Sequence, residues 1–518
     1  MIRRLRFFFL PFLGRDFAPR RHPPCAGWLS GLLLVATVAV TSAGKPRVVV
    51  TTDGEVDDMN SLIRMLHYAN EFEWEGIVIT SSIWHYAGDG KGTLFTSEDP
   101  EQVERYGERT DLRWTGVEWV DDIIDLYAEV YPNLRLHAPG YPSPESLHEL
   151  VKVGNITFEG EMAVDTEGSQ WIEALLLDDE PGPLWLHAWG GANTIARALK
   201  AIEARHRGTS EWERIYRKVT EKAVLYMVAD QDATYRNYIE PHWPDLPVLY
   251  NLNQHEPIGY GWWRINQPSR LAYLRGAWWR EYVKLGHGAL GGRTYLWGDG
   301  QQTAGDPLQQ NGSLAETRQA GRDRYDFISE GDSVAILHQL PVGLRSEEDP
   351  TYGGWGGRLV RSDGEAVRWE ATRAVTDLNT ETGAADYAYP VSRWLPAFQN
   401  DYAARADWAV LPYDEANHPP VVTVEGPLDL TAKAGETITL TGTASDPDGD
   451  ALDLRWWQYR EAGTAPYPAT LTVLGDGRVQ IQVPVHAEPG QTLHFILEAT
   501  DDGEPALTRY RRVIVTLN

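Results

Sequence analysis

The sequence predicts an α/β protein with an open, mostly parallel sheet and helices on both faces, followed by an all-β sandwich of immunoglobulin-like type. Two observations carry this prediction. Up to about residue 417, short β-branched runs alternate with stretches of apolar residues at helical spacing, as in βαβ units. Beyond it, roughly eight short alternating segments show no helical period and are separated by Gly, Pro and Asp. The linker His418-Pro419-Pro420 divides the chain into 44–417 and 418–518.

The first part opens on a buried strand at 47–52, a β-branched run that suits a parallel sheet. Apolar residues at helical spacing then predict a helix over 57–70, and a second strand follows at 76–80. The same order of strand and helix recurs at 183–202, and a further strand is expected at 223–228. These units predict parallel strands joined by right-handed crossovers.

Residues 1–43 have the layout of a secretory signal. Six arginines precede an apolar stretch that ends in Thr41-Ser42-Ala43. We expect cleavage near Ala43 and export to the periplasm or the extracellular space, with an uncleaved anchor as the alternative. The single cysteine, Cys25, lies inside this segment, so the mature chain would have no disulfide.

The composition excludes several classes of protein. The 518 residues are 42% hydrophobic and 23% charged, which rules out disorder and collagen. The 47 basic and 74 acidic residues give a net charge of −27, which disfavours nucleic acid as a partner and favours bound cations. No transmembrane segment follows the leader, so no membrane contact is expected afterwards. The 21 tryptophans suit either sugar-stacking surfaces or large cores.

The densest chemical signal is the segment Asp53-Gly54-Glu55-Val56-Asp57-Asp58, where the first strand ends and its helix begins. Ligands bind at that edge of open α/β sheets, and Gly54 allows a tight turn there. Four acids so close together repel one another unless a cation lies among them. The alternative is a helix whose first turn carries solvated acids, which the helix dipole favours.

This segment resembles the signature of the nucleoside hydrolases, and more closely the nucleoside-hydrolase-like domains of exported bacterial proteins, some of them called cellulose-binding. Thr51 to Asp58 stands where the hydrolases have D-x-D-P-G-x-D-D, and Trp189 to Thr194 where they have T-G-x-L-T-N. Gln231 to Pro241 lies near their sugar-binding segment, and Glu330 to Ser333 stands at their late H-D motif. The resemblance covers about residues 45–415, and the tail resembles an immunoglobulin-like or cadherin-like domain.

The resemblance implies a calcium site and a set of sugar contacts. Asp53, Asp58 and Asp332 would give carboxylate oxygens to Ca²⁺, and Trp189 would add its backbone carbonyl. A calcium-bound water near Asp53 would attack the anomeric carbon, while Asp57 holds ribose-like hydroxyls. The residues expected to support the binding loop or hold other hydroxyls are Asn193, Gln231, Asp232 and Asn237.

Departures from the family pattern leave the leaving group without an assigned acid. The family's first aspartate is Thr51 here, and the histidine before its late aspartate is Gly331. His287, between glycines, is the nearest substitute, and a loop histidine without a role is the alternative. His85 follows the second strand at the ligand edge, where it either binds substrate or only packs and caps.

Aromatic and acidic groups outside this signature admit two interpretations each. Trp355, in a glycine-rich loop with Arg358, is expected to stack on a ligand, whereas the paired tryptophans elsewhere suit packing or stacking. In the tail, Asp446-Pro447-Asp448-Gly449-Asp450 with Asp501-Asp502 forms either a second calcium site or a solvated hairpin turn.

Two functions remain open at this point. One is an exported, calcium-dependent hydrolase of N-glycosidic or related glycosyl bonds. The other is a weakly active or inactive carbohydrate-binding protein that uses the same calcium site. Thr51 and Gly331 favour the second, whereas the retained acids Asp53, Asp57, Asp58 and Asp332 favour the first. In both cases the partner is a small sugar-containing substrate or a glycan, and a homo-oligomer is left open.

Overall fold

The computed structural model describes residues 44–306 and 314–518. The predicted signal segment, with Cys25 and the cleavage position, lies outside the described residues. Within them, no helix is both long and apolar enough to cross a membrane.

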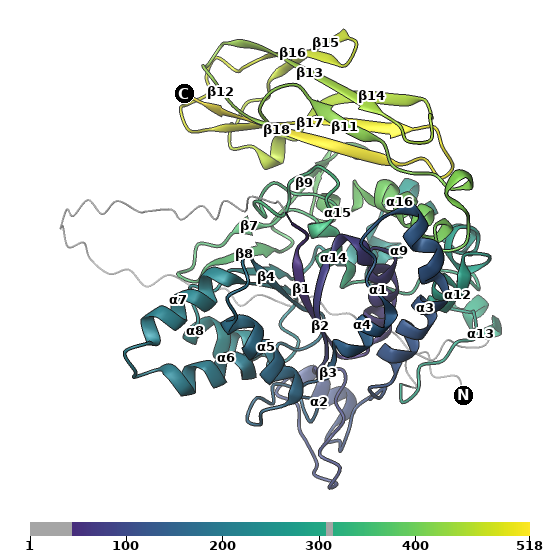
Figure 1. The fold of residues 1–518 in the computed structure, drawn as a ribbon, viewed down its shortest axis with the longest axis vertical. Coiled ribbons are helices and arrows are strands. Elements are labelled where there is room, and N and C mark those ends of the chain that lie inside the picture. Colours follow the sequence, from purple (N-terminus) through teal and green to yellow (C-terminus); the bar gives the residue numbers. More distant parts are fainter. Residues whose placement is uncertain (1–43, 307–313) are drawn as a thin grey trace. The chain divides into compact units, whose positions relative to one another are not determined.

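An eight-stranded sheet forms the body of the first part (Figure 1). Its strand order is β3-β2-β1-β4-β5-β6-β8-β7, and all neighbours pair in parallel except β7 with β8. The strands are β1 (Arg47–Thr52), β2 (Glu73–Ile79), β3 (Val151–Val153), β4 (Leu184–Ala188), β5 (Ala223–Val228), β6 (Val248–Asn251), β7 (Val360–Arg361) and β8 (Arg368–Ala371). The prediction of an open, mostly parallel sheet is confirmed.

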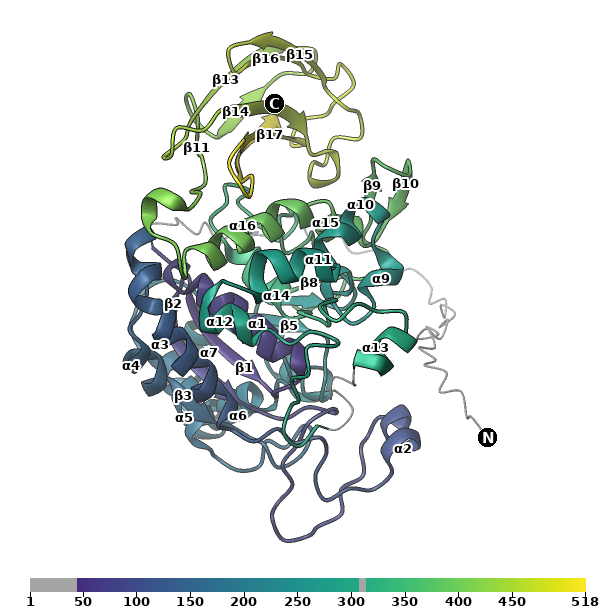
Figure 2. The same ribbon diagram turned by 90° about the vertical axis from the view of Figure 1, so that its right-hand side faces the viewer.

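Side chains of β1 alternate between two cores, one on each face of the sheet. Val48 and Val50 join the first core, and Val49 joins the second. The second core is covered by α5 (Glu167–Leu177), α6 (Asn193–His206) and α7 (Trp212–Lys222). On the other face lie α1 (Val56–His67), α3 (Trp119–His137), α14 (Ser333–Gln339) and α16 (Leu395–Asp407), as Figures 1 and 2 show.

Shorter elements complete this part of the chain. The helices are α2 (Pro100–Tyr106), α4 (Pro144–Glu149), α8 (Glu240–His242), α9 (Trp262–Ile265), α10 (Pro268–Leu271), α11 (Gly276–Trp279), α12 (Gly288–Arg293), α13 (Leu314–Gln319) and α15 (Tyr389–Ser392). A two-stranded sheet pairs β9 (Asp377–Asn379) with β10 (Ala384–Asp386). The predicted helix 57–70 ends earlier, at His67, because a 3₁₀ turn at Ala69–Glu71 leads the chain into β2.

The strand order creates a switch point at the carboxyl end of β1. The chain runs from β1 to β2 and β3 on one side of the sheet, and β4 then begins the series on the other side of β1. The connections that leave β1 and β4 therefore diverge, which opens a crevice between them. The segments after Thr52 and Ala188 meet there.

The C-terminal part is a sandwich of two four-stranded sheets, as predicted. One has the order β11-β13-β16-β15 and the other β12-β18-β17-β14. The strands are β11 (Val421–Val424), β12 (Asp429–Ala432), β13 (Thr437–Ser445), β14 (Leu452–Gln458), β15 (Thr470–Gly475), β16 (Arg478–Gln482), β17 (Thr492–Asp501) and β18 (Thr508–Leu517). The Asp-rich loop between β13 and β14 is closed by Asp446, whose Oδ1 accepts hydrogen bonds from the backbone amides of Asp448, Gly449 and Asp450.

Candidate functional site

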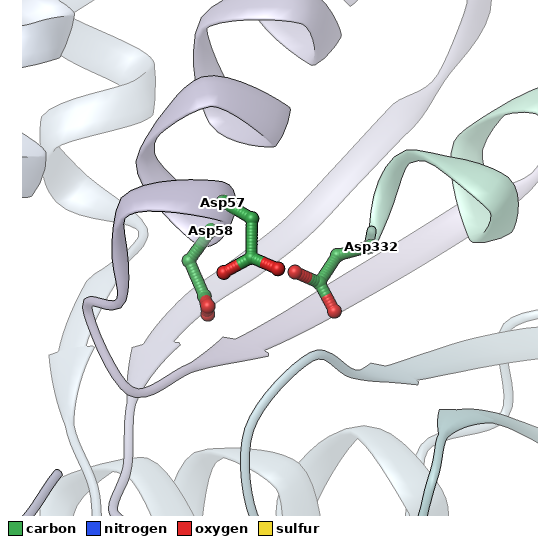
Figure 3. Close-up of side chains that lie close together, drawn as sticks. All are labelled: Asp57, Asp58 and Asp332. Atoms are coloured by element: carbon green, nitrogen blue, oxygen red, sulfur yellow. The ribbon is translucent and has the colours of Figure 1, made fainter. Parts of the chain in front are cut away.

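Four aspartates lie together at the switch point. Asp53 follows β1, Asp57 and Asp58 stand in the first turn of α1, and Asp332 is the residue before α14. Figure 3 shows the carboxylates of Asp57, Asp58 and Asp332 turned toward one another. One ligand oxygen from each of these three lies within 4.8 Å of the others. We call Asp57, Asp58 and Asp332 the acidic triad.

Asp53 adjoins the acidic triad and keeps one oxygen free. It is 1% exposed; its Oδ1 accepts a hydrogen bond from the Glu55 amide at 3.2 Å, and its Oδ2 has no hydrogen-bond partner among the described residues. Its own amide donates to Oδ1 of Asp58 at 3.2 Å. Gly190 allows the loop after β4 to approach, since a Cβ there would lie 2.7 Å from Cβ of Asp53. A buried carboxylate oxygen without a donor is costly unless a ligand satisfies it.

The four carboxylates differ in their affinity for protons. Burial, followed by the repulsion of Glu55 and Asp53, raises the pKa of Asp57 to about 8. Burial and neighbouring carboxylates also raise the pKa of Asp58 and that of Asp332 well above the ordinary value. Burial acts in the same direction on Asp53, but the nearby imidazole of His85 and its charge outweigh it and lower the pKa of Asp53. Asp53 is therefore the carboxylate of this group that is ionised at neutral pH.

His85 lies between two carboxylates and away from solvent. Its Nδ1 is 3.8 Å from Oδ2 of Asp53, and its Nε2 is 3.3 Å from Oδ2 of Asp306. These acids raise the pKa of His85 to about 9, against its burial and the nearby charge of Arg113. Arg113 in turn donates to both oxygens of Asp306, at 2.9 and 2.8 Å, and pairs with Glu55 at 3.3 Å. The imidazole of His85 thus lies between two carboxylates, with Asp53 at Nδ1 and Asp306 at Nε2.

The donor set at this site fits a hard divalent cation. Carboxylate oxygens are the ligands that Ca²⁺ prefers, and it accepts 6–8 of them in flexible geometry. The acidic triad and the free Oδ2 of Asp53 supply such oxygens, and a cation would relieve the repulsion that raises their pKa values. The resemblance implied Asp53, Asp58 and Asp332 as ligands, whereas the closest grouping includes Asp57 in place of Asp53. The carbonyl of Trp189 accepts a hydrogen bond from Nε2 of Gln231.

Two of the expected sugar contacts are engaged inside the protein. The Asn193 amide nitrogen donates to Oγ of Ser81 and the carbonyl of Asn155, both at 2.9 Å, and its oxygen accepts from Thr80. Asp232 accepts from the backbone amide of Asn193 at 2.9 Å, which caps α6, and burial raises its pKa to about 7. Both side chains hold the loops after β4 and β5 in place. They are not free to bind a sugar in this arrangement.

Asn237 does not join this group either. It is exposed and stands in the π-helical turn Tyr235–Ile239. The side chain of Gln231, like that of Asp232, reaches the segment that follows β4, through its bond to the carbonyl of Trp189.

His287 lies far from the aspartates, which corrects its expected role. Its Nδ1 pairs with Asp407 at 2.9 Å, at the end of α16, and its Nε2 contacts the carbonyl of Glu281. Its charge also acts on His67, the last residue of α1. The aspartates stand at the first turn of α1, and twelve residues at about 1.5 Å each separate the two ends.

Trp355 was expected to stack on a ligand from an open loop, but it lies in the core. Its side chain is completely buried and packs against Phe398, and Arg358 pairs with Asp377. Gly356 explains this, because a Cβ there would lie 2.4 Å from the carbonyl of Val334 in α14. These glycines permit close packing of backbone on backbone and do not make an open loop.

Three residues at the site were missed. Tyr260 donates to Oδ1 of Asp57 at 3.1 Å, and Ser329 donates to Oδ2 at 3.2 Å. His255 lies beside Gly331: a Cβ on that glycine would be 3.5 Å from Cδ2 of His255. Nδ1 of His255 has no hydrogen-bond partner among the described residues. His255 comes four residues after β6, so recognising that strand would have placed it at the ligand edge, whereas nothing local marks Tyr260.

Two family models match separate parts of the chain. The family "Cellulose-binding Sde182, nucleoside hydrolase-like domain" matches residues 47–359, and "Cellulose-binding protein Sde0182, C-terminal domain" matches 437–517. A solved structure of a nucleoside hydrolase-related hypothetical protein from Saccharophagus degradans, described as associated with carbohydrate metabolism, is 28% identical. The match covers 92% of this chain and 100% of that one, with a TM-score of 0.66.

More distant structures are similar to parts of the chain. A plant nucleoside hydrolase is 11% identical over 71% of this chain and 100% of its own, with a TM-score of 0.29. A fragment of human CDH23 is 14% identical over 19% of this chain and 35% of its own, with a TM-score of 0.14. No curated protein matches. On the match over 47–359, the chain belongs to the family of Sde182 proteins with a nucleoside hydrolase-like domain.

Proposed function

We propose that this protein is an exported, calcium-dependent hydrolase of N-glycosidic or related glycosyl bonds in a ribose-like or other sugar. The observation that carries the proposal is the grouping of Asp53 with the acidic triad at the switch point, where Asp53 keeps a free, buried Oδ2. Asp53, Asp57 and Asp58 come from one segment between β1 and α1, and Asp332 comes from the distant residue before α14, so the fold adds an acid that the acidic turn does not itself contain.

In this proposal Asp53 is the general base. It is ionised at neutral pH, because His85 lowers its pKa, and its Oδ2, which lies 3.8 Å from Nδ1 of His85 and makes no hydrogen bond within the described residues, would accept a proton from water. Asp58, Asp332 and Asp57 would hold Ca²⁺, which when bound supplies positive charge next to the attacking water and binds sugar hydroxyls. Tyr260 and Ser329 fix the orientation of the Asp57 carboxylate.

On the leaving-group side, His255 replaces His287 in our proposal. Its ring lies beside Gly331, next to Asp332 of the acidic triad, and its Nδ1 accepts or donates no hydrogen bond within the described part of the chain. Burial lowers the pKa of His255, so the neutral ring predominates at neutral pH, and its minor protonated form would be the acid that gives a proton to a departing group.

A carbohydrate-binding protein without catalysis is the second candidate. It is supported by the description of the matching family as cellulose-binding and by the absence of the family's first aspartate, replaced by Thr51. Thr51 is buried and donates to the carbonyl of His187 at 3.2 Å, so it brings no charge to the site.

One experiment separates the two candidates. The full chain is incubated with calcium and a panel of nucleosides, nitrophenyl glycosides and cello-oligosaccharides, and released sugar is quantified beside isothermal titration. Turnover that is lost on chelation and in Asp53→Asn supports the hydrolase. Calcium-dependent binding of an oligosaccharide without product, equal in wild type and Asp53→Asn, supports the binding protein instead.

A further inference from the structure

A guanidinium group lies between two indole rings near the site. The Cζ atom of Arg322 is 3.6 Å from the ring centre of Trp297 and 4.4 Å from that of Trp263. Its side chain makes no hydrogen bond or ion pair with the described residues. We call Arg322, Trp263 and Trp297 the arginine sandwich. Stacking holds the guanidinium plane in place and leaves its N–H donors at the edge available to a ligand.

No described acid compensates the charge of the arginine sandwich by a direct contact. Burial lowers the pKa of Arg322 to about 10, and the charge of Arg264 adds to this effect while Asp326 opposes it. Arg264 lies over the same Trp263 ring, at 5.4 Å. The carboxylate of Asp326 is already bound, by Arg275 at 3.3 Å and by the amide of Gly276 at 2.8 Å. Two like charges thus share one indole in a protein whose net charge is −27.

Three chain segments connect the arginine sandwich to the acidic triad. Trp263 comes three residues after Tyr260, which donates to Asp57. Trp297 comes two residues after Tyr295, whose amide donates to the side chain of Asn60 in α1. The segment after Arg322 pairs with the one containing Trp297, through Gly298 N to Arg324 O at 2.8 Å, and continues to Ser329 at Asp57.

These connections limit the distance along the chain between the arginine sandwich and the residues that contact the acidic triad. Three residues of chain span at most about 10 Å, which is the length of one or two sugar units. This bound applies to the backbone between Tyr260 and Trp263, whose side chains add their own lengths, so an anionic group at the arginine sandwich would belong to a sugar beyond the one at Asp53.

We propose that the arginine sandwich binds the carboxylate, sulfate or phosphate group of an acidic glycan or glycoside whose reacting sugar lies at the aspartates. This rests on the proposed function for the position of the reacting sugar, and it names the class of substrate. Arg322 would hold the anion through paired N–H donors, a geometry for which a fixed guanidinium is suited. The indole faces would pack against the sugar ring.

The test compares two disaccharides that differ by one carboxylate. Isothermal titration of the full chain, in calcium, measures the affinity for a uronic acid disaccharide and for its neutral counterpart. We expect the acidic sugar to bind about tenfold tighter or more, the worth of a charge-assisted hydrogen bond. Arg322→Gln should abolish that preference, and Arg322→Lys should retain part of it. As a control, Arg478→Gln removes the same charge from β16 in the C-terminal part and should leave the preference unchanged.

Each other outcome overturns the proposal. Equal affinity for the two disaccharides in the wild type excludes a site for an acidic sugar, and if inorganic phosphate still bound there, the site would be one for a free anion. If Arg322→Gln reduced the affinity for both disaccharides equally, Arg322 would have a packing role only. Asp332→Asn separates this proposal from the proposed function: it should lose calcium binding and turnover, yet keep the preference for the acidic disaccharide.

Discussion

Gly331 and His255 share one space beside the acidic triad. A Cβ on Gly331 would lie 3.5 Å from Cδ2 of His255 and 3.1 Å from Oδ2 of Asp57. The missing side chain at 331 therefore leaves room for an imidazole that comes from the loop after β6. Position 331 is glycine where the nucleoside hydrolase pattern has histidine, and a histidine from the loop after β6 lies next to it.

This relationship predicts which histidine matters for unactivated substrates. His255→Ala should reduce turnover of a natural nucleoside or glycoside by roughly 10²–10⁴, the usual worth of general acid catalysis. A nitrophenyl glycoside, whose leaving group needs no proton, should be affected little. The measurement is kcat/KM for both substrates. His287→Ala serves as the control and should change neither value, since His287 is tied to Asp407; equal losses on both substrates in His255→Ala would reject the acid role.

A second prediction concerns the number of bound calcium ions. Asp58→Asn should reduce the calcium stoichiometry by one, because it removes a charged ligand from the acidic triad. The asparagine oxygen can still accept the hydrogen bond from Thr52. Turnover should be lost with it. The control is Asp363→Asn, which removes the same charge from an exposed loop. An unchanged calcium stoichiometry in Asp58→Asn would show that the ion is held elsewhere.

The raised pKa of Asp57 predicts how stability depends on pH without calcium. In the folded protein this carboxyl keeps its proton up to about pH 8, whereas in the unfolded chain it loses it near 3.8. The folded state therefore binds more protons, and stability falls as pH rises through that interval. The free energy of unfolding in urea with a chelator should decrease up to about pH 8 and level off above it. Asp57→Asn should make this slope shallower, since the raised pKa values of Asp58, Asp332 and His85 contribute to it as well, and calcium should remove the part due to the carboxylates.

Buried histidines produce the opposite slope at lower pH. Burial lowers the pKa of His187 to about 3 and that of His338 to about 4, both from 6.5. Their neutral forms stabilise the fold above about pH 6.5, and this contribution is lost as pH falls toward about 4. The pH dependence of the unfolding free energy that is due to Asp57 is therefore measured above about pH 6.5, and that due to the histidines below it. We expect the free energy of unfolding to fall on acidification both with and without calcium. If calcium abolished this fall, the carboxylates and not these histidines would be its cause.

The last prediction tests the support behind Asp53. Asp306→Asn removes the negative charge at Nε2 of His85, so the pKa of His85 should fall from about 9. Histidine ring signals in a selectively labelled sample, followed by NMR over pH, measure it. The exposed acid Asp363 provides the control, because Asp363→Asn should leave the His85 titration unchanged. An unaltered pKa in Asp306→Asn would mean that Asp53 alone sets it.

The sequence predicted the parts of the site that depend on local pattern. The run of β-branched residues before Asp53 and the helical spacing after it place a strand, a turn and three acids at one edge. For Asn193 the sequence left support of a loop and contact with the sugar open, and for Asp232 it favoured the sugar, because the partners of both side chains come from distant segments. Ser81 and Asn155 take the Asn193 amide, and no spacing within 189–194 reveals that.

The sequence could not place the histidines relative to the aspartates for a related reason. A glycine-flanked histidine looks accessible in a sequence, but accessibility says nothing about which end of the sheet its loop reaches. His287 belongs to the segment before α12, near the end of α1, and His255 belongs to the opposite edge. Only the order of the strands, with β6 beyond β5, decides this.

The long interval of chain between Asp57 and Asp332 has a consequence for folding kinetics. Residues so far apart in sequence meet only after the loop between them has closed, an entropically costly and slow event. If the acids of the turn after β1 stay hydrated until α14 packs beside them, their mutual repulsion arises only when that long loop has closed. A divalent cation at this place would therefore act after the rate-limiting collapse, so it would slow unfolding and leave the folding rate nearly unchanged.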